Sequence, residues 1–303
     1  MKKIIILLVM FLFSQIALAI TPEEAYQQWK VNYDSNSITC FEAEYCIDNI
    51  ELLHADQHEY VIDYVKQLVK GDKFYKEENG HVDSWEHEGK VIPEYNFSWK
   101  TSSDGVTHKA LHLKSFAIFS DASSFETLKR DSYCAEVLLL DEISEEAYTI
   151  RRLTDFELEK KYGSAYGQGI ELGVKIIKIG SEDVECIGFK RHFSPFPDGK
   201  IFTAEVWLAV DKGMLPVKFV ADLDGVVEQT LDVHEIIELD GYFYPKKART
   251  KQTRRRKDAA SIKEYTLINF KRDPLHDCEI FDMKLAPGTR VFDKRINEEY
   301  TIY

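Results

Sequence analysis

The residue types and spacings that could support catalysis are few in this chain. Gly167, Gly169 and Gly173 loosely resemble a dinucleotide-binding loop, but the spacing is one residue too long, and a helix is predicted before it where a strand is required. We therefore predict a loop. Ser164 directly follows Gly163, which excludes a nucleophile elbow. A hydrolase with a triad scattered along the sequence stays an alternative without a supporting motif.

The histidines do not predict a metal site. His54 and His58 are spaced as on a metal-binding helix, but they lie in a polar connection between predicted strands, which favours a solvated loop. His108 and His112 share one face of a predicted strand at a separation of about 13 Å, too far for one metal ion. We expect no metal and no cofactor.

Two charged groups have both a functional and a structural interpretation. Glu42 and Glu44 could pair for acid–base chemistry, but they lie on one side of a predicted strand, opposite Phe41 and Tyr45, as solvent-facing residues do. The basic run Arg254 to Lys257 could bind an anionic headgroup or phosphate, and a solvated hairpin tip is the favoured interpretation. The sequence thus predicts no catalytic residue, and we expect a protein that is not an enzyme.

The start of the chain predicts export. Lys2 and Lys3 precede a continuous apolar stretch, Ile4 to Phe13, and Ala17-Leu18-Ala19 fits a cleavage site. The apolar stretch is shorter than the span of about 20 residues that crosses a bilayer. We expect a cleaved signal peptide at 1–19, a single domain at 20–303 that does not span a membrane, and a periplasmic or secreted location.

The net charge limits which binding partners are expected, and the cysteine count limits which disulfide bonds can form. The net charge of −13 becomes −13 − 2 = −15 without the leader lysines, which argues against nucleic-acid binding and against adhesion to anionic lipid surfaces. The five cysteines are Cys40, Cys46, Cys134, Cys186 and Cys278, and an odd number leaves at least one unpaired. Cys40 and Cys46 lie in one predicted strand about 20 Å apart and should not pair with each other.

The longest regular pattern runs from Ile201 to Leu239, where apolar residues recur at every second position, as in a sheet with one buried face. Its apolar faces are Phe202, Ala204, Val206, Leu208 and Val210, then Leu215, Val217, Phe219 and Ala221, then Val227, Leu231, Val233, Ile237 and Leu239. Tight turns are predicted at Asp198-Gly199, Lys212-Gly213, Asp224-Gly225 and Asp240-Gly241. This pattern predicts an antiparallel meander. Trp207 lies on the opposite face and predicts a strand covered on both sides, on one of them by a helix.

Helices are predicted at two places. Thr21 can cap a helix with Pro22 at its first position and Glu24 closing a capping box, and Ala25, Trp29 and Tyr33 form its apolar stripe. Ser144 to Tyr162 predicts a second helix. Strands are predicted at 38–47, through 59–112, and from 174 nearly to the end, where Pro287-Gly288 forms a turn, whereas 114–143 is not assigned. The fold class predicted is α+β, with helices laid against an antiparallel sheet.

Several stretches resemble the LolA/LolB-like superfamily, which includes RseB-type periplasmic regulators and proteins labelled outer membrane lipoprotein-sorting protein. The most specific is Val206-Trp207-Leu208 followed by the stretch Asp211 to Lys218, and the segments 29–45, 183–189 and 237–245 add to it. The resemblance implies an incomplete β-barrel, a curved antiparallel sheet with helices covering its concave face, and an apolar cavity suited to acyl chains.

The function expected is therefore non-enzymatic binding of a lipid or a lipoprotein acyl chain in a half-barrel. The candidate cavity lining is apolar and aromatic and consists of Trp29, Tyr33, Phe41, Tyr45, Val206, Leu208, Val217 and Phe219. The alternative is an envelope protein–protein interaction or sensor module on the same fold, with a filled core and a protein partner.

Overall fold

The structure, a computed structural model, describes residues 20–33, 40–52, 58–71, 73–87, 90–112, 116–121, 138, 168–193, 200–254, 259–274 and 278–303. Of these residues, 73% are in strands, and nearly all the strands belong to one sheet. The predicted signal peptide and the predicted helix at 144–162 lie outside the described residues. No helix within the described ranges is long and apolar enough to cross a membrane.

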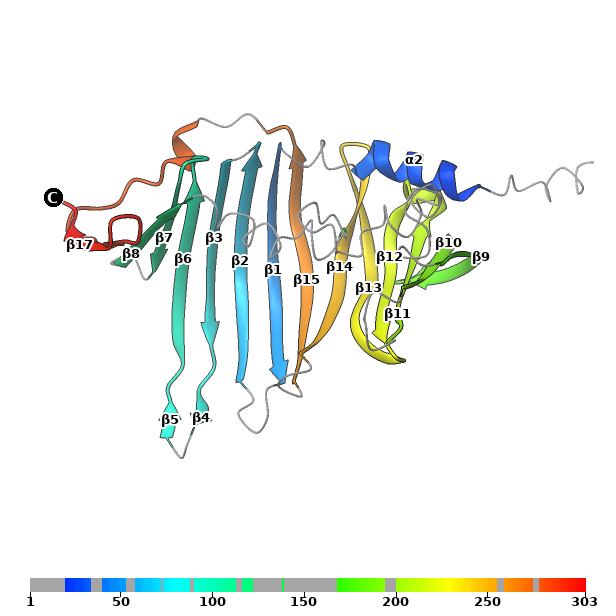
Figure 1. The fold of residues 1–303 in the computed structure, drawn as a ribbon, viewed down its shortest axis with the longest axis horizontal. Coiled ribbons are helices and arrows are strands. Elements are labelled where there is room, and N and C mark those ends of the chain that lie inside the picture. Colours follow the sequence, from blue (N-terminus) through cyan, green and yellow to red (C-terminus); the bar gives the residue numbers. More distant parts are fainter. Residues whose placement is uncertain are drawn as a thin grey trace, which may run out of the picture.

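The main sheet has 15 strands in the order β17-β16-β8-β7-β6-β3-β2-β1-β15-β14-β13-β12-β11-β10-β9, shown in Figure 1. Its first half contains β1 (Cys40–Leu52), β2 (His58–Lys70), β3 (Lys73–Val82), β6 (Tyr95–Ser103), β7 (Thr107–His112) and β8 (Phe116–Asp121). Its second half contains β9 (Gln168–Ile179), β10 (Glu182–Phe193), β11 (Phe202–Ala209), β12 (Leu215–Leu223), β13 (Val226–Leu239), β14 (Tyr242–Arg254) and β15 (Ala259–Arg272). The short strands β4 (Trp85–His87) and β5 (Lys90–Ile92) form a separate hairpin. The two halves join where β1 pairs with β15.

The predicted meander is confirmed as β11, β12 and β13, with antiparallel neighbours throughout. Asp224 and Gly225 both have positive φ, 53° and 77°, and so do Asp240 and Gly241, at 52° and 79°. Two consecutive positive φ angles define the hairpin turn whose twist matches that of its strands, and Asp-Gly adopts it at low cost. These local preferences explain why the turns were predictable. The predicted turn at 198–199 lies outside the described part of the chain.

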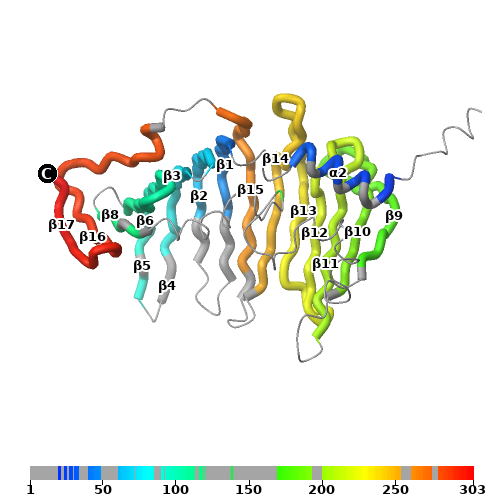
Figure 2. Tube along the Cα trace, turned by 45° about the horizontal axis from the view of Figure 1, so that its top comes forward, coloured from blue at the N-terminus to red at the C-terminus, as the bar shows by residue number. Residues whose placement is uncertain are grey.

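One face of the sheet is buried, and we call it the core face. Phe41, Ala43, Tyr45 and Ile47 of β1 point to it and are at most 5% exposed, as their alternation predicts. At the β9 end the sheet is strongly curved, because the turn between β9 and β10 reaches β13, where a Cβ on Gly180 would lie 3.2 Å from the carbonyl oxygen of His234. Figure 2 shows the order of these strands at this end of the sheet. The core face is therefore concave at this end.

The predicted α+β class, with helices covering the concave face, is wrong. The described residues contain one α-helix, α2 (Pro22–Tyr33), and the short 3₁₀ turns η3 (Val210–Lys212) and η5 (Cys278–Phe281). A helix of 12 residues is about 18 Å long, whereas 15 strands extend over about 65 Å. The structure is one large open sheet, and α2 lies at one end of the strands near the η3 turn (Figure 1).

The helix itself forms as predicted. Glu24 N–H donates to the Thr21 hydroxyl at 3.2 Å, and Thr21 N–H donates to the Glu24 carboxylate at 2.9 Å, which completes the capping box. Ala25, Trp29 and Tyr33 are at most 6% exposed and belong to the core. The stripe therefore packs toward the sheet as its spacing predicts.

The glycine-containing segment at 167–173, predicted as a loop, forms strand β9 from Gln168 onward. Gly173 has a φ of 76°, and the register against β10 shifts at this point, which is the geometry of a β-bulge. A glycine spacing that favours a loop is equally compatible with a bulged strand. Within the unassigned stretch 114–143, residues Phe116–Asp121 form β8.

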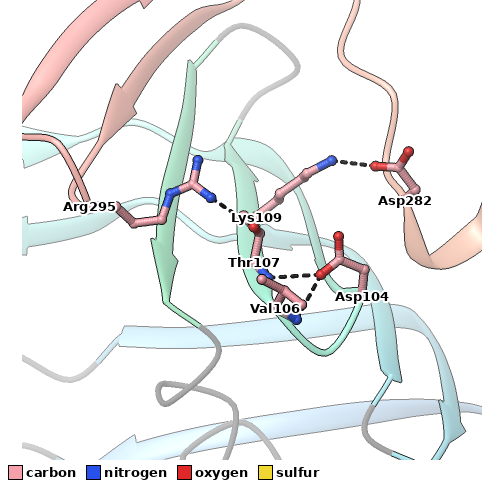
Figure 3. Close-up of polar contacts among 6 residues, drawn as sticks. All are labelled: Asp104, Val106, Thr107, Lys109, Asp282 and Arg295. Atoms are coloured by element: carbon pink, nitrogen blue, oxygen red, sulfur yellow. Dashed lines mark hydrogen bonds and ion pairs between the residues drawn. The ribbon is translucent and has the colours of Figure 1, made fainter.

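The C-terminal segment closes the other edge of the sheet. After the confirmed turn at Pro287-Gly288, β16 (Arg290–Asp293) runs parallel to β8 and pairs with β17 (Glu298–Thr301). Figure 3 shows how this segment is fixed to the β6–β7 hairpin: Lys109 donates to Asp282, and Arg295 donates to Thr107 at 2.7 Å. Asp104 accepts from the amide N–H groups of Val106 and Thr107 and so fixes the hairpin turn.

The Asp293–Arg295 pair predicts a pH dependence of stability. Asp293 is 2% exposed, and the hydrogen bond from Arg295 Nε at 2.8 Å holds its carboxyl pKa below the usual range. Because the pKa is lower in the folded state, the ionised carboxylate stabilises the fold above the unfolded pKa of about 3.9. This stabilisation is lost as the pH falls through the folded pKa. We expect Asp293→Asn to be less stable than the natural protein at pH 6. This difference in the free energy of unfolding should disappear toward pH 2.5. Urea unfolding at several pH values measures it, and a deficit that is constant with pH would contradict the assignment.

Candidate functional site

The predicted lining residues all lie on or against the core face, in one buried cluster. They come from α2, β1, β11 and β12 and are at most 6% exposed: Trp29, Tyr33, Phe41, Tyr45, Val206, Leu208, Val217 and Phe219. The structure therefore brings together segments that are far apart in the sequence. The core face also includes strands β13 to β15, through Leu231, Tyr244, Tyr265 and Phe270, which the prediction did not include.

Aromatic rings connect the two halves of this face across the β1–β15 junction. Phe41 stacks on Phe270 with ring centroids 5.5 Å apart, and Tyr244 follows at 4.4 Å from Phe270. The rings of Tyr45 and Tyr265 lie 6.1 Å apart across the same junction, with their planes tilted by 41°. The apolar surface is therefore continuous from β1 to β14.

The C-terminal end of α2 is fixed to the sheet by polar contacts. The Tyr33 hydroxyl donates to the carbonyl oxygen of Phe243 at 2.8 Å and lies 3.2 Å from that of Lys212. Burial raises the pKa of Tyr33, so the hydroxyl keeps its proton. Asn32 Nδ2 donates to the Gly213 carbonyl oxygen at 3.0 Å. These bonds attach one end of the helix at the η3 turn and the start of β14.

Arg272 completes this attachment from β15. Its guanidinium lies 3.5 Å from the ring centroid of Tyr242, donates to the Tyr244 hydroxyl at 2.7 Å, and donates to the Asn32 carbonyl oxygen. A cation at the last carbonyls of a helix is favoured by the helix dipole. No sequence pattern identified Arg272, because its partners lie on α2 and β14.

The core face becomes polar at β2 and β3. Gln67 of β2 is fully buried directly opposite Ala43, and Lys76 of β3, its other cross-strand neighbour, is 8% exposed. Lys76 Nζ forms an ion pair with Glu78 at 2.7 Å. Sequence reasoning missed these residues, although a signal was present: Gln67 interrupts the apolar alternation between Val65 and Val69.

Beyond this polar region lies an exposed tryptophan. Trp99 of β6 is 44% exposed, and its ring lies 5.2 Å from that of Phe97 and 5.8 Å from that of His112. His108 of β7 is 8% exposed, and its burial lowers its pKa. In the described ranges no group of His, Cys, Asp and Glu side chains could hold a metal ion. His54 lies outside these ranges.

On the opposite, outer face of the sheet the prediction for Glu42 is wrong. Glu42, predicted to face solvent, is 4% exposed, with Lys66 Nζ at 2.8 Å. Its burial follows from its register partner Leu68, on which Phe281 of η5 packs. Glu44 is partly exposed and lies 3.4 Å from the same lysine. Both carboxylates thus belong to an ion-pair cluster on the outer face and not to the core face.

Trp207 is covered on the outer face as predicted, but a helix does not provide the cover. Its ring lies on Gly188 of β10, where a Cβ would come within 2.7 Å of ring atoms. Lys175 Nζ of β9 lies 3.4 Å from the ring centroid, and the indole N–H donates to Glu205 at 2.6 Å. Neighbouring strands of the same sheet bury this side chain to 6% exposure.

The prediction that Cys40 and Cys46 do not pair with each other is confirmed, since both are free thiols, as is Cys186. Burial raises the pKa of Cys186 to about 12, which leaves it protonated and unreactive. Cys134 lies outside the described residues. Of the basic run at 254–257, the structure describes Arg254 alone, at the end of β14.

Comparisons with known proteins give two structural likenesses. A DUF1329 family protein from Desulfovibrio piger is 12% identical, with 86% of this chain and 97% of that chain covered and a TM-score of 0.39. A LolA superfamily protein from Nitrosomonas europaea is 14% identical, with 86% and 98% covered and a TM-score of 0.38. No family model and no curated protein sequence matches the chain.

Proposed function

We propose that the protein binds an acyl chain or a similar lipid on its core face without transforming it, and that it acts in the periplasm or outside the cell as a single domain at 20–303. The observation that carries this proposal is the continuous apolar and aromatic surface of an open sheet, from β1 through β15 to β11, with α2 over one end of it. Apolar surfaces with a few placed polar groups are typical of small-molecule sites.

Binding requires part of the cover to move, because the lining side chains are at most 6% exposed. The helix α2 is suited to such a movement. Asn32 and Tyr33 bond the sheet at the C-terminal end of the helix, and the capping box at its N-terminal end is formed by residues of the helix start itself. A lipid chain that enters between α2 and the sheet would exchange one apolar contact for another.

A second candidate function is protein–protein interaction, and strand β9 favours it. This strand lies at the edge of the sheet, and its side chains Val174 and Ile176 are 55% and 59% exposed. An apolar edge strand is a template for pairing with a strand of another protein. Binding at this edge would leave the core face filled.

The test is native mass spectrometry of the exported protein together with displacement of a fluorescent fatty acid. We expect a co-purified mass in the range of a lipid, released by organic extraction, and saturable binding of the probe. A protein that carries no lipid and does not bind the probe would contradict the lipid proposal and leave the interaction function in its place.

A further inference from the structure

Gln67 is a polar residue of β2 that lies between two apolar residues of the same strand on the core face. Its neighbours on the same face of the strand, Val65 and Val69, are at most 5% exposed, and Gln67 itself is fully buried. The residue opposite it on β1 is Ala43, whose small side chain leaves the amide uncovered by that neighbour. Burying an amide in such surroundings is unfavourable unless it forms hydrogen bonds.

The amide of Gln67 is satisfied at one end. Its Oε1 accepts a hydrogen bond from the Tyr45 hydroxyl at 3.3 Å, which sets the orientation of the group. Its Nε2 is buried and has no hydrogen-bond partner among the described residues. A buried side-chain donor without a partner is uncommon in native proteins and calls for an explanation.

We propose that Gln67 Nε2 donates a hydrogen bond to the ester or amide carbonyl oxygen of the bound lipid. This inference rests on the proposed function and names the polar group that the core face recognises. The donor is neutral, and the adjacent cation, Lys76, is already paired with Glu78 at 2.7 Å. A desolvated carboxylate or phosphate would need a positive charge that this pair does not supply, whereas a neutral carbonyl needs only a donor.

The position of Gln67 also orients the lipid. The apolar and aromatic surface extends from β1 and β15 toward α2 and β11, on one side of Gln67. On the other side lie Lys76, Glu78 and the exposed Trp99. The acyl chain therefore runs from Gln67 toward Trp29, and the polar end of the lipid lies toward β3 and β6.

The experiment compares two probes that differ only in the carbonyl, 1-oleoylglycerol and its ether analogue 1-O-oleylglycerol, by displacement of a fluorescent fatty acid methyl ester. One neutral hydrogen bond predicts about five- to tenfold tighter binding of the ester by the natural protein. In Gln67→Leu the two probes should bind equally. The control Asn269→Leu removes a side-chain amide from the outer face of β15, where Asn269 pairs with Glu44, and should keep the preference for the ester.

If the natural protein binds both probes equally, the role of Gln67 is overturned but lipid binding is not. The same holds if Gln67→Leu still prefers the ester. If neither probe binds and the purified protein carries no lipid, the proposed function itself is overturned. If Gln67→Leu does not fold, Gln67→Met, which is unbranched and adaptable, takes its place.

Discussion

Replacing Trp207 with alanine is expected to lower the free energy of unfolding by about 3–5 kcal/mol, the range for removal of a buried large aromatic side chain. The ring fills the space above Gly188 and is covered by Lys175, so its loss uncovers the backbone of β10 and removes a cation–π contact. Equilibrium unfolding in urea measures the change.

The matched control is Trp207→Phe, which keeps an aromatic ring above Gly188 and should cost less than half as much. A loss below about 1 kcal/mol in Trp207→Ala would place the side chain on an open surface and contradict the packing described here. Lipid binding should be unchanged in both variants, since Trp207 lies on the outer face.

Replacing Tyr33 with alanine is expected to cost about 3–5 kcal/mol and to release the C-terminal end of α2. The side chain is 1% exposed, and its hydroxyl bonds the carbonyl oxygen of Phe243 at 2.8 Å. The same unfolding experiment measures this loss, and faster amide hydrogen exchange in α2 would report the release of the helix.

Tyr33→Phe separates the hydrogen bonds from the packing. It removes the hydroxyl alone and should cost about 1–2 kcal/mol, because the carbonyl oxygens of Phe243 and Lys212 lose a buried donor. If Tyr33→Ala and Tyr33→Phe are equally stable, the ring does not pack on the sheet and α2 is held by other contacts.

The parts of the fold that sequence could predict are those fixed by local chemistry. The positive φ angles at Asp224-Gly225 and the capping box at Thr21 and Glu24 each depend on residues that are neighbours in the chain. Gly173 shows the limit of such signals, because a bulge within a strand and a loop both favour glycine.

The candidate site was predicted only in part, because alternation within a strand is visible in the sequence and the pairing of distant strands is not. Strand alternation placed Phe41 and Tyr45 on the buried face correctly. It could not place β15 beside β1, since that pairing joins residues at opposite ends of the chain, and Arg272 and Phe270 were missed with it. Glu42 was assigned to solvent because its cover, Phe281, also comes from the distant C-terminal segment.

The central claim, that an acyl chain lies on the core face, is tested most directly by fluorescence quenching in single-tryptophan variants. One variant keeps Trp29, on the core face, and the other keeps Trp207, on the outer face, with the remaining tryptophans changed to phenylalanine. A monoacylglycerol brominated at mid-chain quenches only the rings that its chain touches. We predict saturable quenching of Trp29 and none of Trp207. Binding of the lipid with Trp29 unquenched, or with both rings quenched alike, would contradict the claim.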